Sequence, residues 1–187
     1  MATITTHWQR EQFSLNNAPV RRPGVYIIYL RRTSPIYVGA AHSLREGVRG
    51  RLMARYRILT QHAVNTENYT AKICTVDPLG IRMRRGNSIY YQYVELVERI
   101  ITRTLSEGTR PLRITNVINT RHSISVPQDT KLELTGHPPR MLIERLNRDP
   151  RTDRTNTNPP TYEIRQGQYE SFADGLTLRE LRELEWV

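Results

Sequence analysis

Cysteine and lysine are almost absent from this 187-residue sequence, and it has no long apolar run. Cys74 is the only cysteine, which excludes an internal disulfide and a zinc site built from several cysteines, and which suits the reducing cytoplasm. No run approaches the roughly 18 apolar residues of a membrane-spanning helix. The first residues also lack the apolar stretch of a secretory signal. We therefore expect a soluble cytoplasmic protein that does not bind membranes.

Acidic residues are too few to balance the basic ones. The chain has 28 Lys and Arg against 18 Asp and Glu, a net charge of +10. Only Lys72 and Lys131 are lysine, so arginine, whose planar guanidinium pairs with phosphate oxygens, supplies the rest. A GC-rich genome would also favour arginine codons, but it would leave the net charge unchanged. The charge favours a polyanionic partner, with nucleic acid first.

The length leaves room for one domain with appendages. Polar residues dominate positions 1–22, which we expect to form an N-terminal arm. A core domain over 23–119 and a C-terminal extension over 120–187 complete the predicted organisation. Within the extension, the segment 147–160 is rich in Asn, Thr, Arg and Pro and is predicted to be a linker.

Hydrophobic patterns predict the elements of the core domain. Two β-branched and aromatic runs, 25–30 and 36–38, are separated by turn residues and predict a β-hairpin, and 69–76 predicts a third strand. Helical spacing is found at 43–62 and 89–105. The fold class is therefore α+β, an α/β sandwich with a small three-stranded mixed or antiparallel sheet flanked by helices. Later patterns predict a strand pair, a short helix and a closing helix, at 113–126, 140–146 and 176–184.

Two short motifs flank the predicted hairpin. The tripeptide GVY ends at Tyr26 in the first strand, and YVG begins at Tyr37 in the second, eleven positions later. Side chains opposite or diagonal on neighbouring strands lie about 4.5 to 8 Å apart, so the two phenols lie close together. With the helices and the strand that follow, this pattern resembles the signature of the GIY-YIG nucleases. The alternative is that both are ordinary core tyrosines.

The resemblance implies an arginine on the helix after the second motif, where it would bind the scissile phosphate. A leucine-like residue commonly stands beside that arginine in the family. Arg51, which precedes Leu52, is therefore the preferred candidate, and Arg49 is its rival. The candidates considered are Arg45, Arg49, Arg51 and Arg55.

The resemblance also implies a glutamate on a helix that binds one divalent cation. Glu95 and Glu98 both lie in the predicted helix 89–105. Glu98 is roughly 80° from the middle of the apolar stripe and Glu95 about 140°, so Glu98 borders the core and is the chosen ligand for Mg²⁺ or Mn²⁺. The asparagine expected after this helix corresponds to Asn116, with Asn119 as the alternative.

The resemblance as a whole implies a magnesium-dependent endonuclease that hydrolyses phosphodiester bonds of double-stranded DNA. Tyr26 is the expected general base and Tyr37 the group that positions water, or the reverse, provided that a cation or hydrogen bond lowers a phenol pKa from about 10. His42 and His62 are better explained as surface residues. Stand-alone family members of this size resemble type II restriction endonucleases, which implies site-specific cleavage, terminal segments that read bases, and a homodimer.

Two alternatives remain open from the sequence. The first is a catalytically inactive nucleic-acid-binding protein on the same fold. The second is a basic structural or interaction protein, in which Tyr26 and Tyr37 only pack in the core. The first predicts DNA binding without cleavage under varied metal and salt. The second predicts that Tyr26→Phe and Glu98→Ala act as packing or surface changes, with no selective loss of cleavage.

Overall fold

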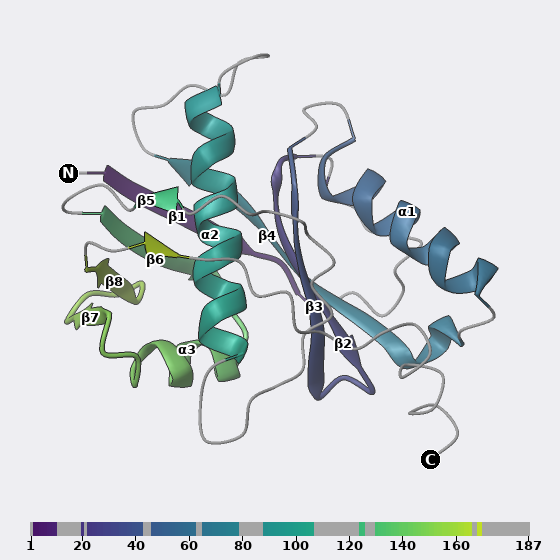
Figure 1. Ribbon diagram of the computed structural model, residues 1–187. Coiled ribbons are helices and arrows are strands. Elements are labelled where there is room, and N and C mark those ends of the chain that lie inside the picture. Colours follow the sequence, from purple (N-terminus) through teal and green to yellow (C-terminus); the bar gives the residue numbers. More distant parts are fainter. Residues whose placement is uncertain are drawn as a thin grey trace.

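A seven-stranded mixed sheet forms the centre of the protein, with the strand order β3-β2-β4-β1-β6-β8-β7 (Figure 1). The strands are β1 (Ala2–Trp8), β2 (Gly24–Leu30), β3 (Ser34–Ala41), β4 (Tyr69–Pro78), β6 (Thr130–Gly136), β7 (Thr152–Thr155) and β8 (Thr161–Ile164). This computed structural model describes residues 2–10, 20, 22–42, 46–62, 65–78, 88–106, 124–125, 130–165 and 168–169.

Helices and short elements surround the sheet. They are α1 (Gly47–Gln61), α2 (Ser88–Ser106), α3 (Arg140–Leu146), the 3-10 turn η2 (Thr66–Asn68), and a separate strand pair of β5 (Ile124–Ser125) and β9 (Gln168–Tyr169). None of the helices in the described part of the chain is long and apolar enough to cross a membrane.

The α+β class, the hairpin, the third strand and the helices α1, α2 and α3 are confirmed. β2 pairs antiparallel with β3 on one side and with β4 on the other. The predicted size of the sheet is wrong, because β1, β6, β8 and β7 extend it beyond three strands. The segment predicted as a linker, 147–160, contains β7. Of the strand pair predicted at 113–126, only β5 is described, and the helix predicted at 176–184 lies outside the described residues.

The predicted arm at 1–22 includes a strand inside the sheet. β1 pairs antiparallel with β4 and parallel with β6. Ile4, Thr6 and Trp8 alternate into the core, each fully buried, while His7 faces the other side. Thr6 is satisfied there, because its hydroxyl donates to the Glu133 carbonyl at 3.0 Å and accepts from the Trp8 indole at 3.1 Å. Threonine favours strands, so the polar composition concealed a β pattern.

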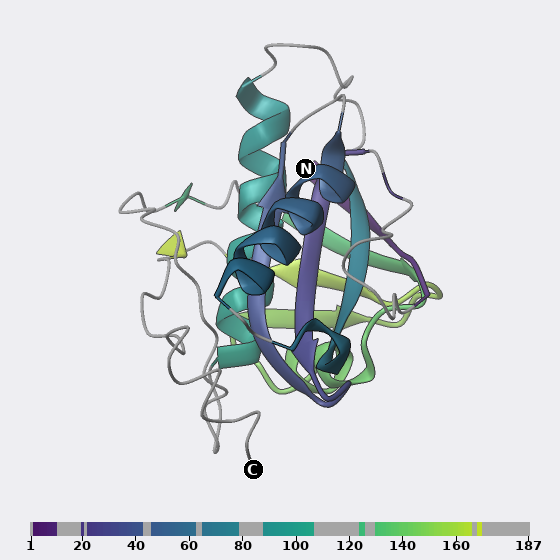
Figure 2. The ribbon, with the colours of Figure 1, turned by 90° about the vertical axis from the view of Figure 1, so that its right-hand side faces the viewer.

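The two faces of the sheet carry separate cores. Alternate residues of β2 belong to different clusters: Val25 and Ile27 pack with α2, whereas Tyr26 and Ile28 pack with α1. Figures 1 and 2 show α1 and α2 on opposite sides of the β2–β3 hairpin. The α2 core continues over β1, β6 and β8 to α3, so the described part of the 120–187 extension shares the core of the rest.

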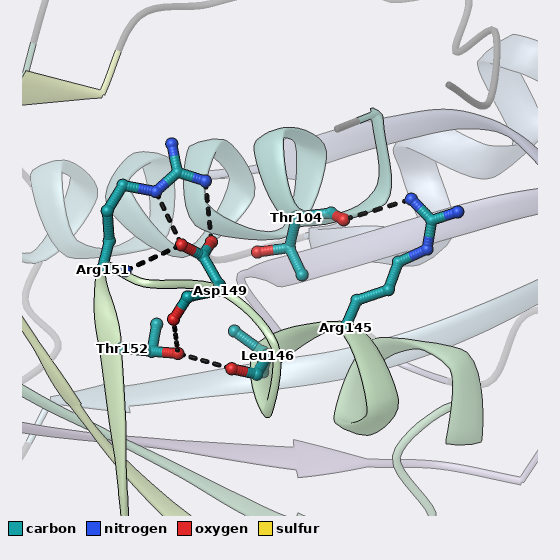
Figure 3. A network of polar contacts seen from close by, with 6 residues as sticks. All are labelled: Thr104, Arg145, Leu146, Asp149, Arg151 and Thr152. Carbon is teal, nitrogen blue, oxygen red and sulfur yellow. Dashed lines mark hydrogen bonds and ion pairs between the residues drawn. The ribbon is translucent and has the colours of Figure 1, made fainter. Parts of the chain in front are cut away.

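A polar network fixes the C-terminal end of α2 (Figure 3). Arg145 of α3 donates to the Leu105 carbonyl at 2.8 Å, one of the carbonyls that a helix end leaves without an intrahelical partner. Asp149 accepts two hydrogen bonds from the Arg151 guanidinium, at 2.8 and 2.7 Å, and the Thr152 hydroxyl bonds back to the α3 end. α3 thereby binds the end of the helix that carries the predicted metal ligand, and the bonds of Asp149, Arg151 and Thr152 join β7 to α3.

The position of β1 predicts a large difference between two neighbouring substitutions. Trp8→Ala should lower the free energy of unfolding by about 3 to 5 kcal/mol, because it empties a fully buried site. His7→Ala, on the exposed side of the same strand, should cost less than about 1 kcal/mol. Urea denaturation followed by circular dichroism measures both. Equal, small effects would mean that the segment is an arm after all.

Candidate functional site

Tyr26 and Tyr37 lie together on the α1 face of the β2–β3 hairpin. The register pairs Tyr26 with Gly39 and Ile28 with Tyr37, so the two tyrosines are diagonal neighbours. Their ring centroids are 5.9 Å apart and the rings are inclined by 27°. Both side chains are buried. The predicted approach of the two phenols is confirmed.

Gly39 makes room for this pair. A Cβ at this position would lie 2.6 Å from Cζ and the hydroxyl of Tyr26, and 2.6 Å from Cε1 of Tyr37. Any side chain here would therefore displace both rings. The glycine that ends the second motif has a direct steric role, which is to let the Tyr26 ring lie across β3.

Arg55 is the arginine that contacts the tyrosine pair. Its Nη2 donates to the Tyr37 hydroxyl at 2.7 Å, and its guanidinium carbon lies 4.8 Å from the centre of the Tyr37 ring. The same guanidinium hydrogen-bonds and attracts Tyr26. The sequence spacing indicates that Arg55 lies on the buried face of the helix, because Val48, Leu52 and Arg55 follow the i, i+4, i+7 pattern of one helix face.

The preferred candidate Arg51 and its rival Arg49 lie elsewhere on α1. Arg51 is exposed, and its charge favours the ionised form of Glu98. Arg49 is partly exposed, and its backbone N–H donates to the Val20 carbonyl at 2.8 Å. The structure thus places Arg55 in contact with the phenols, whereas the charge of Arg51 acts on the carboxylate of Glu98.

Glu98 lies at the outer edge of β3, where α2 packs. It is 5% exposed and accepts a hydrogen bond from the backbone N–H of Ala40. Its Oε1 is buried and has no hydrogen-bond partner within the described residues. Burial raises the pKa of this carboxyl to about 7, and the charge of Glu95 adds to the effect. Its charge also acts on Tyr37, so both belong to one site.

Both phenols have pKa values above the ordinary value, contrary to what a general base requires. Burial is the main cause for Tyr26 and for Tyr37. Arg55 lowers both pKa values, but its effect is smaller than that of burial. The two hydroxyl groups are therefore protonated at neutral pH and available as hydrogen-bond donors.

The remaining predicted residues have different outcomes. Asn116 and its alternative Asn119 lie outside the described residues. His62 is exposed, as expected. His42 is not a plain surface residue, because its side chain is 34% exposed and its Nε2 lies 3.8 Å from Oε1 of Glu95.

The chemistry of Glu98 fits a divalent cation. A buried carboxylate oxygen without a partner is costly and is satisfied by a cation. Across the described ranges no group of three or more His, Cys, Asp or Glu side chains could hold a metal ion. A single carboxylate agrees with Mg²⁺, which keeps several of its waters in protein sites.

Compared with protein-family models, with curated proteins and with solved structures, the chain matches none of them. The expectation of a GIY-YIG nuclease therefore stays a prediction from the sequence motifs.

The pKa of Glu98 predicts a pH-dependent stability. Because the folded-state pKa of about 7 exceeds the ordinary 4.5, the free energy of unfolding should fall as pH rises through this interval, by about 3 kcal/mol in total. Glu98→Gln cannot ionise and should not show this loss. Urea denaturation at several pH values tests it, with Glu144→Gln, an exposed carboxylate on α3, as the control. Parallel curves for wild type and Glu98→Gln would contradict the prediction.

Proposed function

We propose that this protein is a divalent-metal-dependent endonuclease of the GIY-YIG type that hydrolyses phosphodiester bonds of double-stranded DNA. The observation that carries the proposal is the contact of Arg55 with two stacked, buried phenols, Tyr26 and Tyr37. The charge of Glu98 acts on Tyr37, and its buried Oε1 has no hydrogen-bond partner among the described residues. Site-specific cleavage by a homodimer, as in type II restriction endonucleases, belongs to this proposal by analogy of chain length.

Two phenols and a guanidinium form an anion-binding set. The hydroxyl groups of Tyr26 and Tyr37 stay protonated, so they donate hydrogen bonds, and Arg55 adds a positive charge. Donors that are fixed before the reaction stabilise the charge that builds on the phosphoryl oxygens in the transition state. Burial of the set strengthens these interactions, because water screens them less.

Glu98 is the residue that would hold Mg²⁺ or Mn²⁺. Its carboxylate is fixed by the Ala40 N–H on one side and leaves Oε1 for the cation. A cation bound there would act as a Lewis acid on the phosphate and the leaving oxygen. Because Glu98 must ionise to bind it, metal binding near neutral pH should release a proton.

α1 is the element best suited to contact the DNA backbone. It contains no acidic residue, and its sequence GVRGRLMARYRILTQ includes four arginines. Arg51 and Arg57 are exposed on it, on the helix that also carries the partly buried Arg55. On the distant strands β6 and β8, by contrast, Lys131 forms an ion pair with Glu163 at 2.8 Å.

Removal of one hydroxyl group should abolish most of the cleavage. Tyr37→Phe deletes the acceptor of the Arg55 bond and a phosphate donor, and it should lower the cleavage rate by about 10²- to 10³-fold. Tyr162→Phe is the control, because its hydroxyl bonds Asn147 at 2.9 Å in the β8 region. The measurement is the rate of plasmid linearisation with Mg²⁺, together with the melting temperature of each variant.

These outcomes separate the proposal from its alternatives. A core tyrosine would give unchanged cleavage in Tyr37→Phe. DNA binding by the wild type without cleavage, under varied metal and salt, would identify a binding protein that lacks turnover.

The role of α1 predicts a change in salt dependence. Arg57→Ala should weaken DNA binding for all sequences and reduce the slope of log K against log salt by about 1, because one phosphate contact is lost. Arg148→Ala, an exposed arginine after α3, should leave the slope unchanged. Fluorescence anisotropy with labelled duplex in Ca²⁺ measures the binding. Equal slopes for both variants would remove α1 from the interface.

A further inference from the structure

Consecutive arginines form the turn of the β2–β3 hairpin. Arg31 and Arg32 have φ angles of 51° and 62°, both in the left-handed region. The Thr33 N–H donates to the Leu30 carbonyl at 3.3 Å and closes the turn around them. Positive φ at both central residues is the mark of a type I′ turn, whose twist matches that of the flanking strands.

The geometry of this turn does not explain its arginines. A left-handed backbone brings the Cβ of an L residue close to the following carbonyl oxygen, so Gly, Asn and Asp normally occupy the centre of a type I′ turn. Arg31 and Arg32 are both exposed, so burial of their side chains does little to offset this cost. Costly backbone conformations concentrate where a segment binds a ligand, and a guanidinium group suits an anion. The turn is therefore a candidate anion contact.

η2 and β4 hold the backbone of the turn in place. The Arg31 N–H donates to the carbonyl of Asn68, the last residue of η2, at 2.8 Å. Leu30, which precedes the turn, pairs with Tyr69 at the start of β4. A backbone that is fixed before binding loses less conformational freedom when a ligand arrives. The arginines therefore extend from a prepared position.

The turn lies at one end of the core that α1 covers. Leu30 and Ile36, on either side of the turn, belong to the same core cluster as Val48 and Leu52 of α1. η2 lies against α1, and Figures 1 and 2 show the turn beside the start of β4. Arg57 is exposed in the C-terminal half of α1. Exposed arginines of the turn and of the helix thus surround one core.

The spacing between the turn and the tyrosine pair suits a DNA duplex. Arg32 precedes Tyr37 by five positions in the hairpin. This span is at most about 17 Å at the rise of an extended strand, which equals about five base pairs of duplex. A duplex that places one phosphate at Arg55 and continues along the hairpin therefore brings further phosphates to the turn.

We propose that Arg31 and Arg32 bind backbone phosphates of a DNA duplex about five base pairs from the scissile bond, an inference that rests on the proposed nuclease function. The contact is independent of base sequence, because a phosphate is the same at every step, and it positions the duplex along the hairpin. The arginines are retained in a turn that disfavours them because their charge serves this binding.

The test replaces the arginines with residues that the backbone of the turn favours. Arg31→Asn combined with Arg32→Gly should raise the melting temperature by about 2 to 4 °C, because Asn and Gly adopt positive φ more readily. The same double variant should reduce the slope of log K against log salt by about 2, because two phosphate contacts are lost. Fluorescence anisotropy of the full chain with labelled duplex in Ca²⁺ measures the slope. Arg31→Lys combined with Arg32→Lys keeps both charges and should keep most of the slope.

Arg154→Ala is the matched control, because Arg154 is exposed on the far edge strand β7 and should affect neither measurement. An unchanged slope in the first double variant, together with a reduced slope in Arg57→Ala, would overturn the inference while the nuclease function stands. A fall in its melting temperature would also overturn the inference, since the arginines would then support the turn itself. Absence of DNA binding and cleavage by the wild type would instead refute the proposed function, and the inference with it.

Discussion

The passage of the Tyr26 ring over Gly39 is the contact on which the rest of the site depends. Only the missing Cβ lets the phenol cross from β2 onto β3, where it stacks on Tyr37. The stacked rings then provide the hydroxyl that Arg55 binds at 2.7 Å. Two buried hydroxyl groups and a partly buried guanidinium each cost free energy when they leave water, and the hydrogen bonds among them offset part of that cost.

The edge strand connects two faces that would otherwise be separate. The tyrosines belong to the core beneath α1, where Arg55 binds Tyr37, whereas α2 packs on the other face. Because β3 ends the sheet, a backbone N–H of Ala40 is available to α2, and Glu98 binds it. An interior strand has its N–H groups paired on both sides, so the carboxylate could not approach the tyrosine pair there.

The strands beyond the hairpin act as a scaffold. β1, β6 and β8 extend the sheet under α2, and Arg145 binds the last carbonyls of that helix. The packing of this long helix holds Glu98 in a buried position that is unfavourable for an ionised carboxylate, since burial raises its pKa to about 7. Packing energy from the extension thus offsets the cost of a buried carboxyl group at the site.

The sequence by itself determined the α+β class, the hairpin with its two tyrosines, the choice of Glu98 over Glu95 as the glutamate beside the core, and the positive charge, because these follow from local pattern and helix geometry. Only the tertiary structure decided that β1 is a sheet strand, since its bonds join residues 128 positions apart. It also decided that Arg55 contacts the phenols and that His42 approaches Glu95. Burial raises the phenol pKa values by more than Arg55 lowers them, and this too depends on the tertiary structure. Rotation of a helix, pairing of distant strands and depth of burial depend on the whole chain, and a local pattern contains none of them.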